Sequence, residues 1–115
     1  VRSLCAHCRK PYKALPEVVG QMGLERFAGT GEVTLYHPVG CEHCSGTGYR
    51  GRIGVYEVMP LSEEIRHLIL TGAAEREIKR VATHFGMATL RQNAIVLLRQ
   101  GLTTLDEVVR VTGPD

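Results

Sequence analysis

Cys5-Ala6-His7-Cys8 and Cys41-Glu42-His43-Cys44 are two C-x-x-C segments separated by 32 residues, and they contain all four cysteines of the chain. A C-x-x-C turn brings two sulfurs to one side of a tight loop, so two such turns supply the four ligands of a tetrahedral zinc site. We therefore predict one structural Zn²⁺ bound by Cys5, Cys8, Cys41 and Cys44. Four cysteine ligands leave no open coordination position, so a catalytic role for this metal is not expected.

Two other interpretations of the cysteines stay open at this point: two disulfides, or a redox-active pair. A redox C-x-x-C opens a helix after a strand, whereas Cys8 precedes Arg9-Lys10-Pro11 and Cys44 precedes a Gly-rich turn. His7 and His43 occupy the same inner position of the two segments. We expect both histidines to face solvent and not to bind the metal.

The length and charge of the chain limit the function classes. With 115 residues the chain forms one domain or two small ones. Its formal charge of +2 falls to zero if four thiolates bind one Zn²⁺, and its aromatic content is 5%, which argues against a nucleic-acid surface. No apolar run approaches the roughly 18 to 20 residues of a membrane span, and the first residues resemble no signal peptide. We expect a soluble protein that is not exported.

One helix and one strand are predicted between the cysteine pairs. Pro16 suits the first turn of a helix, and the pattern favours a helix over residues 14–28 that Gly23 ends or bends. The apolar side chains expected on its inner face are Leu15, Val18, Val19, Met22 and Phe27. Gly29-Thr30-Gly31 predicts a turn, and Val33-Thr34-Leu35-Tyr36 predicts a short strand.

The second half of the sequence changes from strand to helix periodicity. Residues 49–59 predict a Gly-punctuated strand pair or hairpin arm that Pro60 ends, and Ser62 then caps the first of four helices. Residues 104–107 predict a capping box for the last helix. The predicted stops are Gly72, Gly86, Gly101 and Gly113-Pro114. The side chains expected to face inward are Ile65, Leu68 and Ile69, then Ile78, Val81, Ala82 and Phe85, then Leu90, Ala94, Leu97 and Leu98, and finally Val108 and Val109.

These patterns predict an α+β fold with two parts. Residues 1–60 form a small tetracysteine zinc-binding subdomain with short strands and one helix, and residues 61–115 form a compact helical subdomain. Gly46-Thr47-Gly48-Tyr49-Arg50-Gly51 spells G-x-G-x-x-G, but a dinucleotide site needs a strand before this motif and a helix after it. Here a cysteine turn precedes the motif and a strand pattern follows it, so nucleotide binding is not expected.

Four blocks occur in a fixed order along the chain. They are Leu4-Cys5-x-x-Cys8, Cys41-x-x-Cys44, Gly48-Tyr49-Arg50-Gly51-Arg52-x-Gly54-x-Tyr56-Glu57, and Gly101-x-Thr103-Thr104-x-Asp106-Glu107-Val108-x-Arg110-Val111-Thr112. In this order they resemble the C-terminal region of the traffic ATPases of type II secretion and type IV pilus assembly, which are hexameric cytoplasmic motors. The resemblance covers essentially the whole chain. One departure is Ala6, where relatives often have proline.

The resemblance implies that this chain is a non-catalytic C-terminal part of such a motor. Relatives bind ATP and Mg²⁺ through a Walker A loop, G-x-x-x-x-G-K-[ST], which this sequence lacks, and none of its lysines, Lys10, Lys13 and Lys79, follows a glycine. We therefore predict no catalytic residue and no cofactor-binding residue besides the zinc ligands. ATP and Mg²⁺ are expected only in the upstream core of the longer protein.

The resemblance also implies partners and a location. A zinc-stabilised module of this kind is expected to contact neighbouring subunits of a homo-hexameric ring and the cytoplasmic domains of inner-membrane platform proteins. It would help to couple ATP hydrolysis to protein secretion or pilus assembly. The expected location is the cytoplasm, peripheral to the inner membrane through those partners, with no direct membrane insertion and no nucleic-acid partner.

Two further questions stay open, one about the arginines near the second cysteine pair and one about the whole chain. Arg50 and Arg52 can offset the negative charge of a zinc tetrathiolate, or they can reach a neighbouring subunit. The whole chain can alternatively be a stand-alone zinc-ribbon module that binds nucleic acid or a chaperone client. That function would need a basic or aromatic face, which the neutral balance and the low aromatic content argue against.

Overall fold

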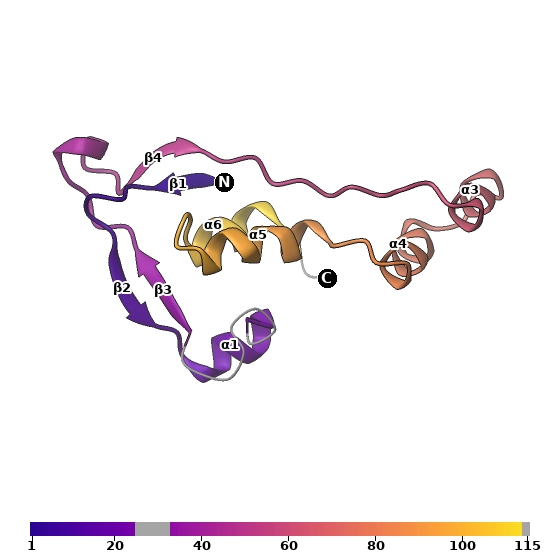
Figure 1. Ribbon diagram of the computed structural model, residues 1–115, viewed down its shortest axis with the longest axis horizontal. Coiled ribbons are helices and arrows are strands. Elements are labelled where there is room, and N and C mark those ends of the chain that lie inside the picture. Colours follow the sequence, from indigo (N-terminus) through magenta and orange to yellow (C-terminus); the bar gives the residue numbers. More distant parts are fainter. Residues whose placement is uncertain (25–32, 114–115) are drawn as a thin grey trace.

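A computed structural model describes residues 1–24 and 33–113 and shows an α+β fold, which confirms the predicted fold class (Figure 1). Two small antiparallel sheets lie in the first half of the chain. They pair β1 (Arg2–Leu4) with β4 (Tyr49–Arg52) and β2 (Lys10–Lys13) with β3 (Thr34–His37). A 3₁₀ turn, η1 (Glu42–Cys44), carries the second cysteine pair. The sheets therefore place the two C-x-x-C segments next to each other.

The first helix, α1 (Pro16–Met22), begins at the predicted proline. It ends at Gly23, which adopts a left-handed conformation with φ of 65° and donates its N–H to carbonyls of the last turn. Leu15 was expected to face inward but is 63% exposed, because it lies at the N-cap before the helical face begins. Phe27 and the predicted turn over residues 29–31 lie outside the described residues.

The predicted strand over residues 49–59 is much shorter in the structure. Pairing with β1 ends at Arg52, and residues 53–62 have no regular secondary structure. Figure 1 shows this segment running as a long extended stretch from β4 to α3. The prediction of a strand pair or hairpin arm was wrong for residues 53–59. Ile53 still exchanges two hydrogen bonds with Val1, but no described segment pairs with the residues beyond it.

Four helices follow, and their caps agree with the sequence. They are α3 (Glu63–Leu70), α4 (Glu75–His84), α5 (Leu90–Arg99) and α6 (Leu105–Val111). The side chains of Ser62, Thr89 and Thr104 each accept a backbone N–H at the start of a helix. Gly72, Gly86 and Gly101 have positive φ angles after the helices that they were predicted to stop.

Some of the predicted inward faces need correction. Ile69 is 49% exposed, Phe85 60% and Val109 51%. Phe85 lies past the last turn of α4, where the helix no longer directs its side chain toward the core. The capping box of α6 is only half formed, since Thr104 accepts the N–H of Glu107 while the Glu107 carboxylate binds arginines instead.

Two separate apolar clusters hold the described residues together. The larger one joins the first half of the chain to α5 and α6, with Leu24, Val33, Leu35, Ala94, Ile95, Leu98 and Val108 buried. The smaller one lies between α3 and α4, with Ile65, Ala82 and Met87 buried. The larger cluster thus contains residues from both sides of position 60, and the division into 1–60 and 61–115 stays a prediction.

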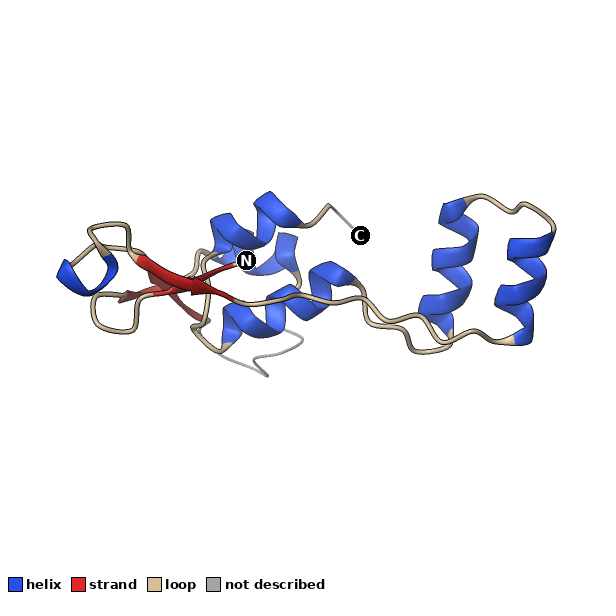
Figure 2. Cartoon of the chain, turned by 90° about the horizontal axis from the view of Figure 1, so that it is seen from above, coloured by secondary structure: helices blue, strands red, loops and turns tan. Residues whose placement is uncertain are grey.

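The α3–α4 hairpin lies away from the rest of the molecule. Figure 2 shows the two helices side by side at one end, connected to the rest by the extended residues 53–62 and by the shorter loop of residues 85–89. The radius of gyration is 16.9 Å, whereas a compact chain of this length has roughly 13 Å. The shape, 54 × 32 × 17 Å, is therefore elongated. Among the described residues, no helix is both long enough and apolar enough to span a bilayer.

Candidate metal centre

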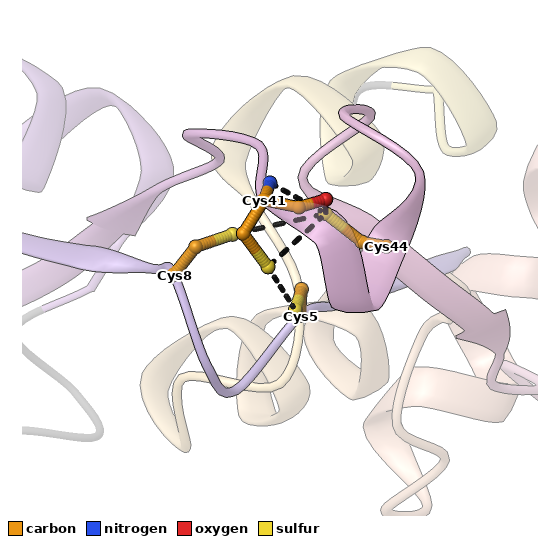
Figure 3. A group of neighbouring side chains, drawn as sticks. All are labelled: Cys5, Cys8, Cys41 and Cys44. Atoms are coloured by element: carbon orange, nitrogen blue, oxygen red, sulfur yellow. Dashed lines mark hydrogen bonds between the residues drawn. The ribbon is translucent and has the colours of Figure 1, made fainter.

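The four cysteine sulfurs converge on one point (Figure 3). All four Sγ atoms lie within 4.8 Å of one another. The Sγ–Sγ distances are 3.7 Å for Cys5 and Cys41, 3.9 Å for Cys8 and Cys44, and 3.8 Å for Cys41 and Cys44. A tetrahedral zinc ion with Zn–S bonds of about 2.3 Å requires its sulfurs to be about 3.8 Å apart. The cluster therefore has the dimensions of a zinc tetrathiolate.

The same distances decide against the alternative of two disulfides. All four cysteines are free thiols in the structure. A disulfide needs sulfurs about 2.0 Å apart, far closer than any of these pairs. The donor set consists of four soft sulfur ligands, which suits zinc better than a hard cation such as Mg²⁺.

Backbone N–H groups surround the sulfurs of the second pair. Cys44 Sγ accepts hydrogen bonds from the N–H groups of Cys41 at 3.2 Å and Gly48 at 3.1 Å. Cys8 Sγ accepts one from the N–H of Gly40 at 3.3 Å. Amide donors of this kind stabilise thiolate charge, as the second shell of a metal site does. The loop around Cys41 and Cys44 thus also provides backbone hydrogen-bond donors to the sulfurs.

The pKa values of the Cys41 and Cys44 thiols shift in opposite directions. Burial raises the pKa of the Cys44 thiol, but hydrogen bonds from the backbone of Cys41 and Gly48 and from neighbouring thiols outweigh it and lower the pKa to about 6. Burial raises the pKa of the Cys41 thiol to about 11, with hydrogen bonding to Cys5 and Cys44 adding to the effect.

Glycines allow the close approach of the two loops. Gly48 has a φ of 83°, and a Cβ at this position would lie 2.6 Å from Cβ of Pro38. Gly40 has a φ of 109°, and its Cβ would lie 2.6 Å from the carbonyl oxygen of Gly46. Both positions require the left-handed region and leave no space for a side chain. The glycines around the second pair therefore fix the shape of the ligand turn.

The remaining predicted residues near the site lie at the surface. His7 and His43 are exposed and outside the sulfur cluster, and their rings stack with centroids 3.9 Å apart. Sequence reasoning anticipated their exposure but missed their contact with each other. Arg50 and Arg52 are also exposed, and no described residue forms an ion pair with either guanidinium.

Arg9 fixes the first cysteine segment to the helical half, and sequence reasoning missed it. Its guanidinium lies 4.3 Å from the centroid of the Tyr36 ring and donates a hydrogen bond to the carbonyl of Gly101. The turn after α5 is also bound to β1, because the N–H of Leu4 donates a hydrogen bond to the carbonyl oxygen of Leu102 at 2.9 Å. The metal centre is therefore attached to the turn between α5 and α6.

A buried carboxylate, Glu107, binds β1 to α6. Its side chain is 1% exposed and accepts hydrogen bonds from the backbone N–H and Nε of Arg2 at 2.7 and 2.9 Å. Nη2 of Arg110 donates a further hydrogen bond to the Glu107 carboxylate at 2.7 Å. Arg2 also lies over the ring of Tyr49, 4.1 Å from its centroid. Arg110 is three residues from Glu107 in the same helix, whereas Arg2 is 105 residues away in sequence.

The comparisons with known proteins cover nearly the whole chain. The family model described as Type II/IV secretion system protein matches residues 1–110. The type IV pilus assembly ATPase PilB of Thermus thermophilus is 42% identical over 112 residues, which cover 97% of this chain and 12% of that protein. PilB of Myxococcus xanthus is 40% identical over 115 residues, covering 99% of this chain and 20% of that protein.

A type II secretion relative matches at a similar level. The type II secretion system protein E of Dickeya dadantii is 44% identical over 112 residues, covering 97% of this chain and 21% of that protein. The chain therefore spans about an eighth to a fifth of the length of these relatives. The resemblance found in the four sequence blocks is confirmed. Since the family model matches nearly the whole chain, the chain belongs to the family of type II/IV secretion system proteins.

Proposed function

We propose that this chain is the zinc-stabilised, non-catalytic C-terminal part of a hexameric motor ATPase for protein secretion or pilus assembly. The observation that carries the proposal is that the family match over residues 1–110 includes the whole four-cysteine cluster. Named relatives are pilus assembly ATPases and a secretion system protein of much greater length. ATP and Mg²⁺ would then bind in the part of the longer protein that this chain does not include.

The proposed role of Zn²⁺ is structural. Cys5, Cys8, Cys41 and Cys44 would hold the ion, whose charge offsets the thiolates and links the two loops that carry them. Binding to a small closed zinc site is worth about 10 to 16 kcal/mol, as much as the whole stability of about 5 to 15 kcal/mol of a typical domain. Zinc would therefore determine whether the segment between the loops, including α1, is presented in a fixed orientation.

The proposed partners are neighbouring subunits of a homo-hexameric ring and cytoplasmic domains of inner-membrane platform proteins. Through them the module would help to couple ATP hydrolysis to secretion or pilus assembly, in the cytoplasm and peripheral to the inner membrane. The exposed apolar side chains of Val58 and Phe85, at 72% and 60% exposure, line the same surface hollow beside α3 and α4, which supports a role in protein contacts.

The test is Cys41→Ser in the full-length protein. We expect zinc to fall from about one ion per chain to near zero, because three thiolates leave the tetrahedral site incomplete. Binding to a platform domain and secretion or pilus assembly in cells should fall with it. Zinc content, partner binding and complementation of a deletion strain measure these effects.

The matched control is His43→Ala. It changes the neighbouring exposed side chain and removes the ring contact with His7, but leaves all four sulfurs in place. This variant should keep its zinc and its partner binding. If Cys41→Ser keeps both as well, the proposed function of the cluster is wrong.

A further inference from the structure

Two arginines lie directly opposite each other in the small sheet of β1 and β4. Arg2 pairs with Arg52 in the antiparallel register, and the two strands lie side by side in Figure 1. Side chains of directly opposite residues lie on the same face of a sheet, where two like charges destabilise the pairing. An anion bound between the two guanidinium groups would remove this repulsion.

The described residues supply too little negative charge for this face of the sheet. The carboxylate of Glu107 binds the guanidinium groups of both Arg2 and Arg110. Arg52 is exposed and forms no ion pair with a described residue. The three arginines therefore carry two positive charges more than the one carboxylate offsets.

Both opposed arginines line the same surface hollow. Its volume is about 250 Å³, and Thr47, Tyr49 and Gly51 complete the lining. Gly51 leaves one wall open, since a Cβ at this position would meet nothing within 4 Å apart from its chain neighbours. The hollow therefore has room for a small anion that enters from solvent.

The guanidinium of Arg2 is oriented before any ligand binds. Its Nε donates to Oε1 of Glu107 at 2.9 Å, and its guanidinium lies 4.1 Å from the centroid of the Tyr49 ring. Tyr49 is held in turn by a hydrogen bond of 2.9 Å between its hydroxyl and that of Thr104. Nη1 of Arg2 has no partner among the described residues, so it stays available as a donor. A side chain that is already oriented loses little entropy when it binds an anion.

We propose that Arg2 and Arg52 bind a phosphoryl group in this hollow. Planar guanidinium groups match phosphate oxygens with pairs of parallel hydrogen bonds. A phosphate monoester carries a charge of about −1.5 to −2 at pH 7, which offsets the excess positive charge, whereas one carboxylate would offset only half of it. The ligand is free phosphate or the terminal phosphate of a nucleotide, which share this chemistry. The inference goes beyond the proposed function, since the hollow contains none of the four cysteines.

The experiment measures how fast phenylglyoxal, a reagent for arginine side chains, modifies individual arginines of the longer, zinc-loaded protein. Peptide mass spectrometry distinguishes Arg52 from Arg50, which is the internal control because it is exposed on the same strand but does not line the hollow. With inorganic phosphate at about ten times its Kd, modification of Arg52 should be about tenfold slower than in chloride of equal ionic strength. Modification of Arg50 should not change.

Two matched variants test whether the opposed arginines act together. Arg52→Gln removes one guanidinium without breaking an ion pair among the described residues, so phosphate should no longer slow the modification of Arg2. Arg50→Gln should leave the protection of Arg2 unchanged. Zinc content should be the same in both variants, since neither arginine provides a sulfur ligand.

A parallel titration with ADP identifies the source of the phosphoryl group. If ADP protects Arg52 at a lower concentration than inorganic phosphate does, the ligand of the hollow is a nucleotide. If inorganic phosphate protects Arg52 at the lower concentration, the ligand is free phosphate.

Three results would overturn the proposal. Unchanged modification of Arg52 in phosphate would show that the hollow binds no phosphoryl group. Equal slowing at Arg50 and Arg52 would show only general screening by ions. Protection by glutarate, a dicarboxylate, as strong as that by phosphate would assign the hollow to acidic side chains of a partner protein. None of these results depends on zinc content or secretion, which Cys41→Ser tests, so the two proposals can fail separately.

Discussion

Glu107 is a buried side chain whose charge depends on two half-exposed arginines. Burial raises the pKa of its carboxyl, but hydrogen bonds from Arg110 and Arg2 outweigh that effect and lower the pKa to about 2. Because the folded-state pKa lies below the ordinary value of 4.5, the carboxylate stabilises the fold fully above about pH 4.5. This stabilisation is lost as the pH falls from there toward 2.

Glu107→Gln should remove this pH dependence. At pH 7 the variant should be less stable by roughly 2 kcal/mol, a value reduced for the exposure of Arg2 and Arg110 to solvent. The difference in unfolding free energy between the wild type and the variant should shrink below pH 4.5. Denaturant titrations of both proteins across this range measure it, and taking the difference cancels the effect of acid on the cysteines. A constant difference at all pH values would contradict the assignment.

Gly46 and Gly48 form a matched pair within the ligand turn. Both have positive φ, at 77° and 83°, but only at Gly48 would a Cβ meet another residue, Pro38, at 2.6 Å. Gly46→Ala should cost about 1 kcal/mol for the left-handed conformation. Gly48→Ala should cost about 1 to 3 kcal/mol more because of overpacking. Unfolding free energies of the zinc-loaded variants test this, and equal losses would show that the Pro38 contact is unimportant.

At the scale of elements, the α3–α4 hairpin has its own small core. Ile65 is 1% exposed within it, whereas Leu70 on the same helix is 85% exposed. Ile65→Ala should cost roughly 2 to 5 kcal/mol, enough to unfold a hairpin with so few buried side chains. Hydrogen exchange should become faster in α3 and α4 but not in α5, and zinc content should not change.

Leu70→Ala is the control, since this side chain loses little contact on truncation. It should leave exchange in both helices unchanged. If Ile65→Ala also speeds exchange throughout α5, the two apolar clusters do not unfold independently.

The elements differ in how much of them the sequence predicts. Caps such as Ser62 and stops such as Gly23 are encoded within a few residues, so the local pattern predicts them. The pattern of residues 53–59 is also correct for a strand, but a strand forms only beside another one. The sequence predicted the propensity of this segment, whereas its secondary structure depends on a neighbour.

The candidate site shows the same division. Spacing predicted that the four cysteines lie together, because two C-x-x-C turns converge whenever their loops meet, and their role as zinc ligands stays a prediction. The contacts of Arg9 with Tyr36 and Gly101, and of Arg2 with Glu107, were not predicted. These partners are far apart in sequence, and no local period connects them.

At the scale of the whole molecule, zinc removal should disorder one end of the molecule and leave the other end folded. Without the ion, the loops that carry Cys5 and Cys41 lose their link, and the adjoining β2–β3 sheet should lose order with Leu35 leaving the larger cluster. The α3–α4 hairpin should persist, because the buried residues of its cluster, Ile65, Ala82 and Met87, all lie outside the two loops that carry the cysteines. Exchange measured before and after chelation, with zinc added back as the control, tests this.

Thiol titration completes that experiment. Four thiols should react rapidly only after chelation, since a metal-bound thiolate is protected. Four thiols that react before any chelator is added would mean that the cluster does not hold zinc in solution.

The elongated shape has a consequence for how the molecule tumbles. A body of 54 × 32 × 17 Å rotates faster about its long axis than end over end. If the two loops that lead to α3 and α4 are stiff, the nuclear spin relaxation of all helices will fit one anisotropic diffusion tensor. If they bend, the hairpin will relax with a shorter correlation time of its own, as a separate small body on a flexible stem.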